Sequence, residues 1–401
     1  MKTDLSLNIE KYNYDLPLNR IAQFPLKKQD HSKLLICKEN QIDQDLFYNI
    51  KKYIPEKSLL VFNDTKVIHA RLLFKKDTGA VIEIFCLEPS GIDIQTAFQQ
   101  KKNCEWKCLI GNNKRWKSGL LEIENEKANL FAERVGQDGE YFIIKFLWEP
   151  ENLTFSEILE IFGKVPLPPY INRDAEESDN TRYQTVYAKN EGSVAAPTAG
   201  LHFTDNILSE LSERGIKKQF LTLHVGAGTF KPVTAQNIAD HEMHEEHFSI
   251  GRGLLKSVLY QVQDNNPVLP VGTTSLRTLE SLYWLGVKRI LKHKNLTFLD
   301  QWEWYNLKEK NISVESSLSA LLEYMHTTNT LQFDGTTQMM IVPGYDFKIA
   351  NGIITNFHQP RSTLLLLIAA MIGKTWEEAY KYAIENDFRF LSYGDCCLFL
   401  V

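Results

Sequence analysis

The 401-residue sequence lacks the features of several common protein classes. Its six cysteines include no Cys-x-x-Cys pair, which disfavours a zinc or disulfide framework and favours free thiols in a reducing compartment. The longest apolar run near the C-terminus, Thr363 to Ile372, is too short to cross a bilayer and is bounded by Arg361 and Lys374. The start of the chain is polar and acidic, unlike a signal peptide. These absences predict a cytoplasmic protein without a membrane segment.

The chain also lacks an excess of positive charge, since its formal net charge is −5. Such a protein does not coat nucleic acid indiscriminately, although a local basic patch can still bind it. The clearest patch lies between residues 101 and 117 and consists of Lys101, Lys102, Lys107, Lys114, Arg115 and Lys117, interleaved with Trp106 and Trp116. We predict that Lys114 and Arg115 contact nucleic-acid phosphates, the alternative being an ordinary solvated surface.

Several predicted strands end in a small or polar loop that opens a helix. Residues 220–225, 268–272 and 353–356 read as strands, and helical patterns follow the second and third of them. This alternation predicts an α/β fold, in which ligands bind at the carboxyl ends of strands. With 43% hydrophobic and 24% charged residues, the chain has the composition of a globular enzyme of one or two domains.

The most informative stretch is Ser193 to Thr204, which is poor in bulk and charge. Its alanines and Gly200 leave the backbone bare, and Pro197 fixes one φ angle. Thr204 then caps a helix predicted over residues 205–214. Bare backbone before a helix suits close approach of a polar or anionic ligand, and the alternative is a tight connection between packed elements.

Residues 70–148 show a different pattern, with short β-like runs at 80–87, 105–110, 120–123 and 141–147 separated by turn residues. We predict a small β-barrel domain over 70–148, inserted into a main α/β domain made of 1–69 and 149–401. Residues 288–337 form a Trp-rich extra segment of the main domain with a helix over 316–326. It either covers an exposed face or alters the binding surface.

The chain resembles the S-adenosylmethionine:tRNA ribosyltransferase-isomerase family of the queuosine pathway. The resemblance runs through ordered motifs: Tyr14–Pro17, Ile21–Gln23, Val61–Ile68, Ala70–Leu72, Pro166–Ile171, Arg182–Ala188, Ser193–Thr204, Leu223–Phe230, Asp240-His241, Met243-His244, Val271–Ser275, Thr355–His358 and Ser392–Asp395.

The resemblance implies an enzyme that moves the ribosyl group of S-adenosylmethionine onto the 7-aminomethyl group of a 7-deazaguanine in tRNA. Epoxyqueuosine-tRNA forms, and adenine and methionine leave. It also implies an α/β domain interrupted by a β-barrel, a monomer and S-adenosylmethionine as co-substrate, with no metal and no permanently bound cofactor. The basic patch would then meet tRNA. The acceptor amine must be neutral and adenine needs a proton donor, so acid–base groups are required.

Histidines inside the motifs are the candidates for acid–base catalysis, and His202, His224 and His241 are predicted for it, against the alternative of packed histidines. Thr273, Thr274 and Ser275 open a helix and could bind a carboxylate such as the methionine tail. The predicted substrate-binding residues are Arg182, Tyr183, Gln184, Pro197, Thr198, Gly200, Gly226, Gly228, Thr273, Thr274, Ser275, Asn356, His358 and Asp395.

Three alternatives stay open. His241, His244 and His247 would approach one face of a helix and resemble a metal site, but the spacing of a zinc protease motif fails at Glu245 and Phe248. A second alternative is a relative with an altered acceptor, since Arg361 stands where the family usually has Glu. The third is a non-catalytic RNA-binding relative, because a fold does not guarantee an activity.

Overall fold

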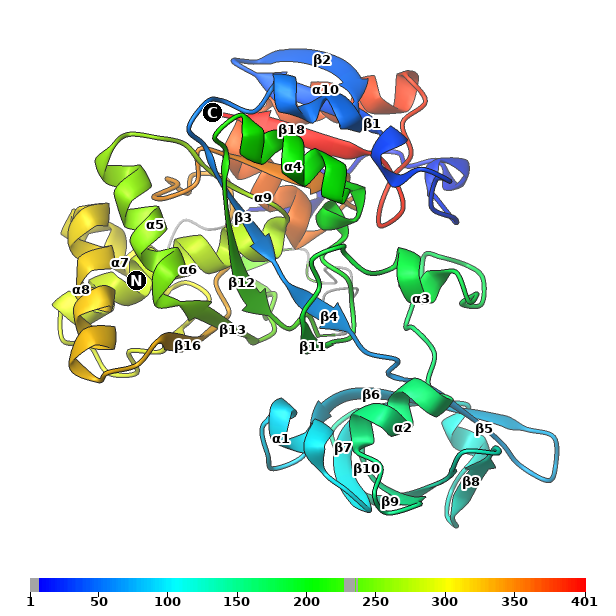
Figure 1. Cartoon of the computed structure of the whole chain (residues 1–401). Helices are drawn as coiled ribbons and strands as arrows, with labels where there is room; N and C mark the ends of the chain where they lie inside the picture. Colours follow the sequence, from blue (N-terminus) through cyan, green and yellow to red (C-terminus); the bar gives the residue numbers. More distant parts are fainter. Residues whose placement is uncertain (1–6, 227–234, 236) are drawn as a thin grey trace.

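The computed structural model describes residues 7–226, 235 and 237–401 and is a mixed α/β structure with several sheets (Figure 1). The largest sheet of the main body has the order β14-β3-β12-β13-β16-β15. Strands β14, β3 and β12 are parallel, whereas β13 is antiparallel to both β12 and β16. The strands are β3 (Leu59–Asn63), β12 (Lys217–Leu223), β13 (Glu246–Gly251), β14 (Val268–Pro270), β15 (Phe298–Leu299) and β16 (Gln332–Thr337).

A second sheet has the order β17-β18-β1-β2 and continues the first at one point. A parallel bridge between Val271 and Ile354 joins the end of β14 to β17. The carboxyl ends of β3, β12, β14 and β17 therefore meet at one edge, as the βα pattern of the sequence predicts. The strands of this sheet are β1 (Lys33–Lys38), β2 (Gln41–Leu46), β17 (Gly352–Asn356) and β18 (Cys396–Leu400).

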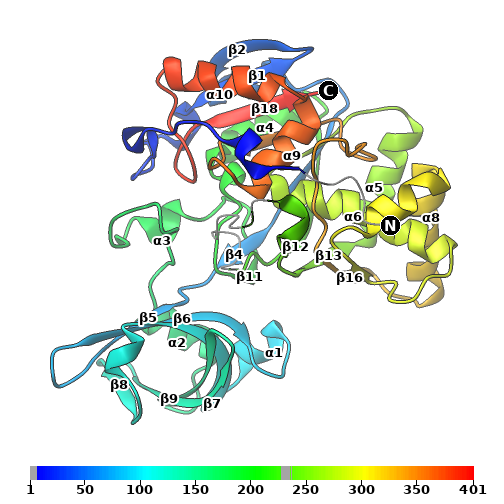
Figure 2. The same ribbon diagram turned by 180° about the vertical axis from the view of Figure 1, so that it is seen from behind.

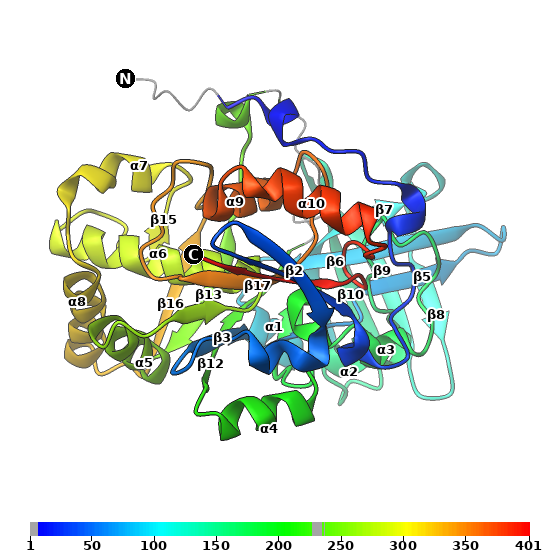
Figure 3. The same cartoon turned by 90° about the horizontal axis from the view of Figure 1, so that it is seen from above.

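Helices cover both faces of these strands, with α9 and α10 on one side and α4 on the other (Figure 3). The predicted cap is confirmed: the hydroxyl of Thr204 accepts a backbone hydrogen bond at the start of α4, and the hydroxyl of Ser362 does the same at the start of α9. The helices of the main body are α3 (Asp179–Arg182), α4 (Asp205–Glu213), α5 (Arg252–Gln263), α6 (Thr273–Ile290), α7 (Glu303–Leu307), α8 (Val314–Thr327), α9 (Thr363–Ile372) and α10 (Thr375–Glu385).

The remaining large sheet is antiparallel and nearly closed, like a barrel, and lies apart from the main body in Figures 1 and 2. Four of its strands were predicted from the alternating pattern, whereas β5 and β9 were not. Its own apolar core also includes Phe155, Ile158 and Leu159 of α2. The elements are β5 (Arg71–Lys75), β6 (Val81–Pro89), α1 (Ile94–Gln99), β7 (Asn103–Gly111), β8 (Leu121–Glu124), β9 (Asn129–Asp138), β10 (Tyr141–Glu149) and α2 (Phe155–Phe162).

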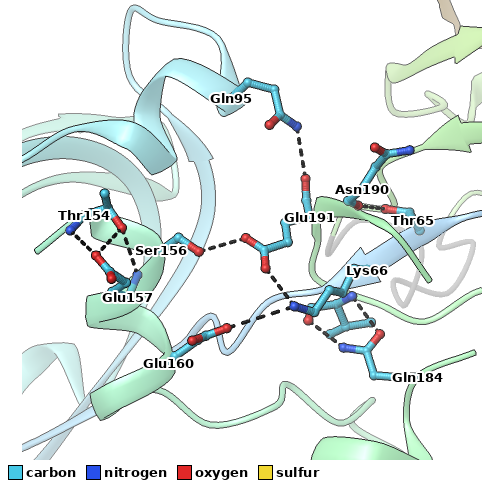
Figure 4. Close-up of polar contacts among 11 residues, drawn as sticks. Thr65, Lys66, Gln95, Thr154, Ser156, Glu157, Glu160, Gln184, Asn190 and Glu191 are labelled. Carbon is cyan, nitrogen blue, oxygen red and sulfur yellow. Dashed lines mark hydrogen bonds and ion pairs between the residues drawn. The ribbon is translucent and has the colours of Figure 1, made fainter.

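Polar side chains connect the barrel-like sheet to the main body (Figure 4). They gather where β4 (Thr65–Val67) pairs with β11 (Asn190–Ser193). The carboxylate of Glu191 accepts hydrogen bonds from Lys66 Nζ at 2.7 Å and from Ser156 Oγ of α2 at 2.8 Å. Burial alone raises the pKa of Glu191, but these two donors outweigh it and the pKa is lowered. The junction is therefore held by a charged cluster.

The segment 288–337 is built into the main body rather than laid over it. Strand β16 pairs with β13 inside the largest sheet, and helix α8 packs on α6. Lys288 Nζ lies 2.7 Å from Glu303 Oε2, and Trp304 Nε1 donates to the carbonyl of Met340 at 3.0 Å. Leu318, Leu321 and Met325 belong to the main apolar core. The predicted helix is confirmed as α8, and the segment contributes to stability as well as to a surface.

Candidate active site

A first pocket opens at the carboxyl ends of β14 and β17 and holds about 950 Å³ of empty space. The loop from Ser193 to Thr204, which we call the bare loop, contributes Ala195 to Ala199 to the wall of this pocket. The start of α6 contributes Gly272 to Thr274, and the turn after β17 contributes Thr355 to Pro360. The described residues that line this pocket include no Asp, Glu, Lys or Arg. Three loops that the sequence singled out separately therefore meet around one uncharged cavity.

Asn356 lies at the end of β17 and is 4% exposed. Its Nδ2 lies 3.0 Å from His202 Nε2 and 3.4 Å from the backbone carbonyl of Asp395. His202 Nδ1 lies 2.8 Å from Ser32 Oγ. Both ring nitrogens of His202 thus have a partner, and the ring lies behind the pocket rather than on its wall.

Burial, together with the smaller effect of the Arg389 guanidinium, lowers the pKa of His202 to about 3. Burial likewise lowers the pKa of His358 to about 3. His358 lines the first pocket, and its Nε2 and Nδ1 lie 3.3 Å from Thr355 Oγ1 and 3.4 Å from the Tyr380 hydroxyl. Both imidazoles are therefore neutral at physiological pH.

A second, larger cleft of about 2140 Å³ lies between the barrel-like sheet and the main sheet. Residues 87–89 and 92–95 form one wall, and β13 and β16 contribute to the other. His224, directly after β12, lines this cleft. Val225 lines both cavities, so the first pocket and the second cleft adjoin at the end of β12.

The ring of His224 is fixed by two neighbours. The Thr65 hydroxyl oxygen lies 3.4 Å from the Asn190 carbonyl and 2.9 Å from His224 Nδ1. The single Thr65 proton can be donated to either acceptor, so either ring nitrogen of the neutral His224 can carry the lone pair. Burial lowers the pKa of His224 to about 4; Asp64 opposes this and His247 adds to it. We call His202, His224 and His358 the three neutral histidines.

The predicted site residues fall into several groups. Pro197, Thr198, Thr273, Thr274, Asn356 and His358 line the first pocket. His224 and Gly226 line the second cleft, and His202 and Arg182 line a small recess beside Ser392 and Arg389. Tyr183, Gln184, Gly200, Ser275, Asp395 and His241 line none of these cavities, and Gly228 lies outside the described residues.

Three residues that line none of these cavities, Gln184, Asp395 and Gly200, contact other parts of the protein interior. Gln184 pairs with both backbone groups of Val67, at 3.0 Å and 2.7 Å. The Asp395 carboxylate accepts from the backbone of Lys33 and of Arg389 at 2.9 Å and 2.7 Å, and burial raises its pKa. At Gly200 a Cβ would lie 2.0 Å from the Tyr187 hydroxyl, so this glycine is required for packing.

The sequence analysis missed further residues of the first pocket. They come from segments distant in the chain: Tyr170, Gln359, Ser362, Thr363, Leu391 and Ser392. Tyr170 and Ser392 lie in the motifs Pro166–Ile171 and Ser392–Asp395, and in the second motif the prediction chose the aspartate, whose carboxylate accepts hydrogen bonds from the backbone. The Ser392 hydroxyl lies 2.7 Å from that of Tyr170, which joins two of the missed residues.

The metal alternative fails on secondary structure. Residues 241–245 are irregular and His247 belongs to strand β13, so the three histidines do not share a helix face. Within 7–226, 235 and 237–401, no group of three or more His, Cys, Asp or Glu side chains could hold a metal ion. Nearby, Arg277 is buried and its guanidinium lies 2.9 Å from the carboxylate of Glu246.

The basic patch also differs from the prediction. Trp106 and Trp116 are fully buried in the core of the barrel-like sheet, so these two rings do not interleave with the lysines at the surface. Lys107 pairs with Asp138 at 3.0 Å. Lys114 and Arg115 are exposed on a short turn after β7 and stay candidates for phosphate contacts.

Arg361 points away from the first pocket. Its guanidinium lies 3.2 Å from Glu10 Oε1, and the residue itself does not line the cavity. Its backbone has φ 53°, which places it in the left-handed turn between β17 and α9. The positive charge of Arg361, at a position where the family usually has Glu, is thus balanced by Glu10 and not directed at a ligand.

Comparisons with known proteins agree with one another. A family model described as queuosine biosynthesis protein matches residues 9–399. A relative from Halothermothrix orenii named S-adenosylmethionine:tRNA ribosyltransferase-isomerase is 37% identical over 98% of this chain and 100% of its own length. One of the same name from Polynucleobacter necessarius is 38% identical over 97% of each chain.

A crystal structure of an S-adenosylmethionine tRNA ribosyltransferase from Thermotoga maritima matches with a TM-score of 0.47 and 26% identity, over 97% of this chain and 100% of that one. None of the described helices is long and apolar enough to cross a membrane. The full-length match to the family model and the identity to both relatives show that the chain belongs to the queuosine biosynthesis protein family.

Proposed function

We propose that the protein is an S-adenosylmethionine:tRNA ribosyltransferase-isomerase. It transfers and isomerises the ribosyl group of S-adenosylmethionine onto the 7-aminomethyl group of 7-deazaguanine in tRNA, releasing adenine and methionine. The observation that supports this most is the pair of cavities that adjoin at Val225, one small and uncharged, the other wide and lined by a histidine. Two substrates that must react need two such adjoining sites.

The first pocket holds S-adenosylmethionine in this proposal. Phe357, Pro360 and Leu364 supply apolar surface for the ligand. The start of α6 at Thr273 and Thr274 offers backbone N–H groups and the positive end of an 18-residue helix to the methionine carboxylate. The alanines of the bare loop let the backbone approach the ligand closely, because their side chains take little space.

The second cleft receives the modified nucleoside, and His224 acts there. Its low pKa keeps the ring neutral, so that it can take a proton from the acceptor amine or from a C–H bond beside sulfur. The roles of His202 and His241 in proton transfer stay predictions: His202 has both nitrogens occupied, and His241 lines neither cavity.

The barrel-like sheet acts in this proposal as an inserted domain, at about residues 70–148, that helps to hold tRNA. It forms one wall of the second cleft through residues 87–95 and carries Lys114 and Arg115. The protein works in the cytoplasm as a monomer, with S-adenosylmethionine as co-substrate and no permanently bound cofactor.

The test is turnover with S-adenosylmethionine and tRNA that carries 7-aminomethyl-7-deazaguanine, followed by adenine release and by mass spectrometry of the nucleoside. Adenine release with the matching mass increase supports the proposal. If folded protein and competent tRNA give no product, the protein is a relative with an altered acceptor or a non-catalytic RNA-binding protein. Binding of S-adenosylmethionine without turnover would favour the altered acceptor.

A further inference from the structure

The amide of Asn356 has one atom without a partner. Its Nδ2 faces the backbone carbonyl of Asp395, which can only accept a hydrogen bond, so this amide atom must be the donor. Oδ1 therefore occupies the other side of the amide. It is buried and has no hydrogen-bond partner among the described residues, although Asn356 lines the first pocket. A buried acceptor left unpaired is costly unless a ligand supplies the donor.

His202 holds this amide in one orientation. Since Asn356 Nδ2 donates to His202 Nε2 at 3.0 Å, that nitrogen carries the lone pair. The ring proton then lies on Nδ1, which donates to Ser32 Oγ at 2.8 Å. Burial keeps the ring neutral, so it does not become a donor at Nε2 and turn the amide round. The Ser32–His202–Asn356 chain thus fixes Oδ1, and not an N–H group, as the atom of the amide that is left to accept a hydrogen bond.

The surroundings of Oδ1 favour one kind of donor. The described residues that line the pocket carry no charge, and an ammonium group buried without a carboxylate partner is strongly disfavoured. A planar base with an amino group fits between Phe357, Pro360 and Leu364 at lower cost. We propose that Asn356 Oδ1 accepts a hydrogen bond from the exocyclic amino group of adenine, and that His202 is a positioning residue that fixes the acceptor. This inference rests on the proposed function.

Two nucleosides test it: 5′-methylthioadenosine and 5′-methylthioinosine, in which the amino donor is replaced by an oxygen acceptor. Calorimetry should show that the intact protein prefers the adenine compound by about tenfold or more, since the exchange leaves two acceptors facing each other. Asn356→Ala should reduce this preference to about twofold or less, because the discriminating atom is gone.

Two replacements of His202 form a matched pair. Gln can place its side-chain oxygen near the Nε2 position and still accept from Asn356, so His202→Gln should keep the preference for adenine. Asn is shorter and reaches only the Nδ1 position, so His202→Asn should lose the preference. A role of His202 in proton transfer predicts instead that both variants lose turnover alike, since neither amide titrates. Thermal unfolding of each variant checks that it is folded.

The inference is overturned if Asn356→Ala keeps the preference for adenine, or if the two His202 variants discriminate equally. The His202 pair leaves Asn356 in place, so the test stands even where Asn356→Ala does not fold. If the intact protein binds neither S-adenosylmethionine nor 5′-methylthioadenosine, the proposed function fails and this inference fails with it. Binding of both nucleosides with equal affinity leaves the proposed function intact and overturns only the inference.

Discussion

Gly192 lies directly against His224, so replacing it by alanine tests this histidine without altering it. A Cβ at Gly192 would lie 2.7 Å from His224 Cε1 and 2.8 Å from Nδ1. Non-bonded carbon atoms are stable at about 3.5–4.0 Å, so the ring must move by about 0.8 Å. The φ of 143° at Gly192 adds backbone strain of about 1–3 kcal/mol, because residues with a Cβ rarely adopt it.

A displacement of this size at a reacting group costs about 100-fold in rate. We therefore expect kcat for adenine release from S-adenosylmethionine with modified tRNA to fall by about 100-fold in Gly192→Ala. Overpacking should lower the free energy of unfolding by about 1–3 kcal/mol, so the assay must be run well below the unfolding temperature. Weak binding of tRNA is excluded by measuring tRNA affinity separately.

The matched control is Gly253→Ala in helix α5, where a Cβ would meet nothing within 4 Å. Alanine at an open helical position should stabilise the protein by about 0.5–1 kcal/mol and leave turnover unchanged. A folded Gly192→Ala enzyme with the kcat of the intact protein would refute the reasoning, because the chemistry would then tolerate a displaced His224.

Three further predictions concern charge. In the folded protein the three neutral histidines have pKa values of about 3 or about 4, below the unfolded value of about 6.5. The unfolded chain therefore binds more protons below about pH 6.5. The free energy of unfolding falls there by up to ~1.4 kcal/mol per pH unit for each histidine. Urea unfolding at pH 5 to 7 checks this, and equal stability across that range contradicts it. Arg277→Ala should lower the free energy of unfolding by about 3–5 kcal/mol, because Glu246 is left buried and unpaired. The double variant Arg277→Met with Glu246→Leu should recover most of this loss. Equal losses in both variants would show that the unpaired charge is not the cause. Lys114→Glu with Arg115→Glu should weaken tRNA binding and flatten its dependence on salt, and unchanged affinity would remove the patch from the interface.

Local features of the sequence predicted the main body well. Thr204 and Ser362 cap the helices that were expected after them, because a side-chain hydroxyl beside the first turn is a signal within a few residues. The loops after β14 and β17 were expected at strand ends, the bare loop was expected before a helix, and all three meet in the first pocket. Parallel pairing of β14, β3 and β12 brings such ends together without further information.

Features that depend on distant contacts could not be predicted. Trp106 and Trp116 read as surface aromatics among lysines, but both are buried in the core of the nearly closed sheet. The pairing of β7 with β6 and β10 decides this for Trp106, and Trp116 follows β7 in a short turn. The same limit applies to Tyr170, whose hydroxyl lies beside that of Ser392, 222 positions further along the chain. Tyr170 and Ser392 both lie in motifs of the family resemblance, but no local pattern shows that their hydroxyls meet beside one pocket.

The described residues that line the first pocket carry no charge, and this bears on how the proposed reaction would be driven. S-adenosylmethionine carries a positive sulfur, and the sulfur of the released methionine is neutral. A carboxylate beside the sulfur would stabilise the bound sulfonium most strongly before reaction. This would lower the free energy of the bound substrate more than that of the transition state. The described lining of the pocket has no carboxylate, and the nearby histidines are held neutral by burial. In the proposed function such a cavity would bind the ligand through its base and its methionine tail and would stabilise the sulfonium little, so that loss of the positive charge would be favoured as the bond to sulfur breaks.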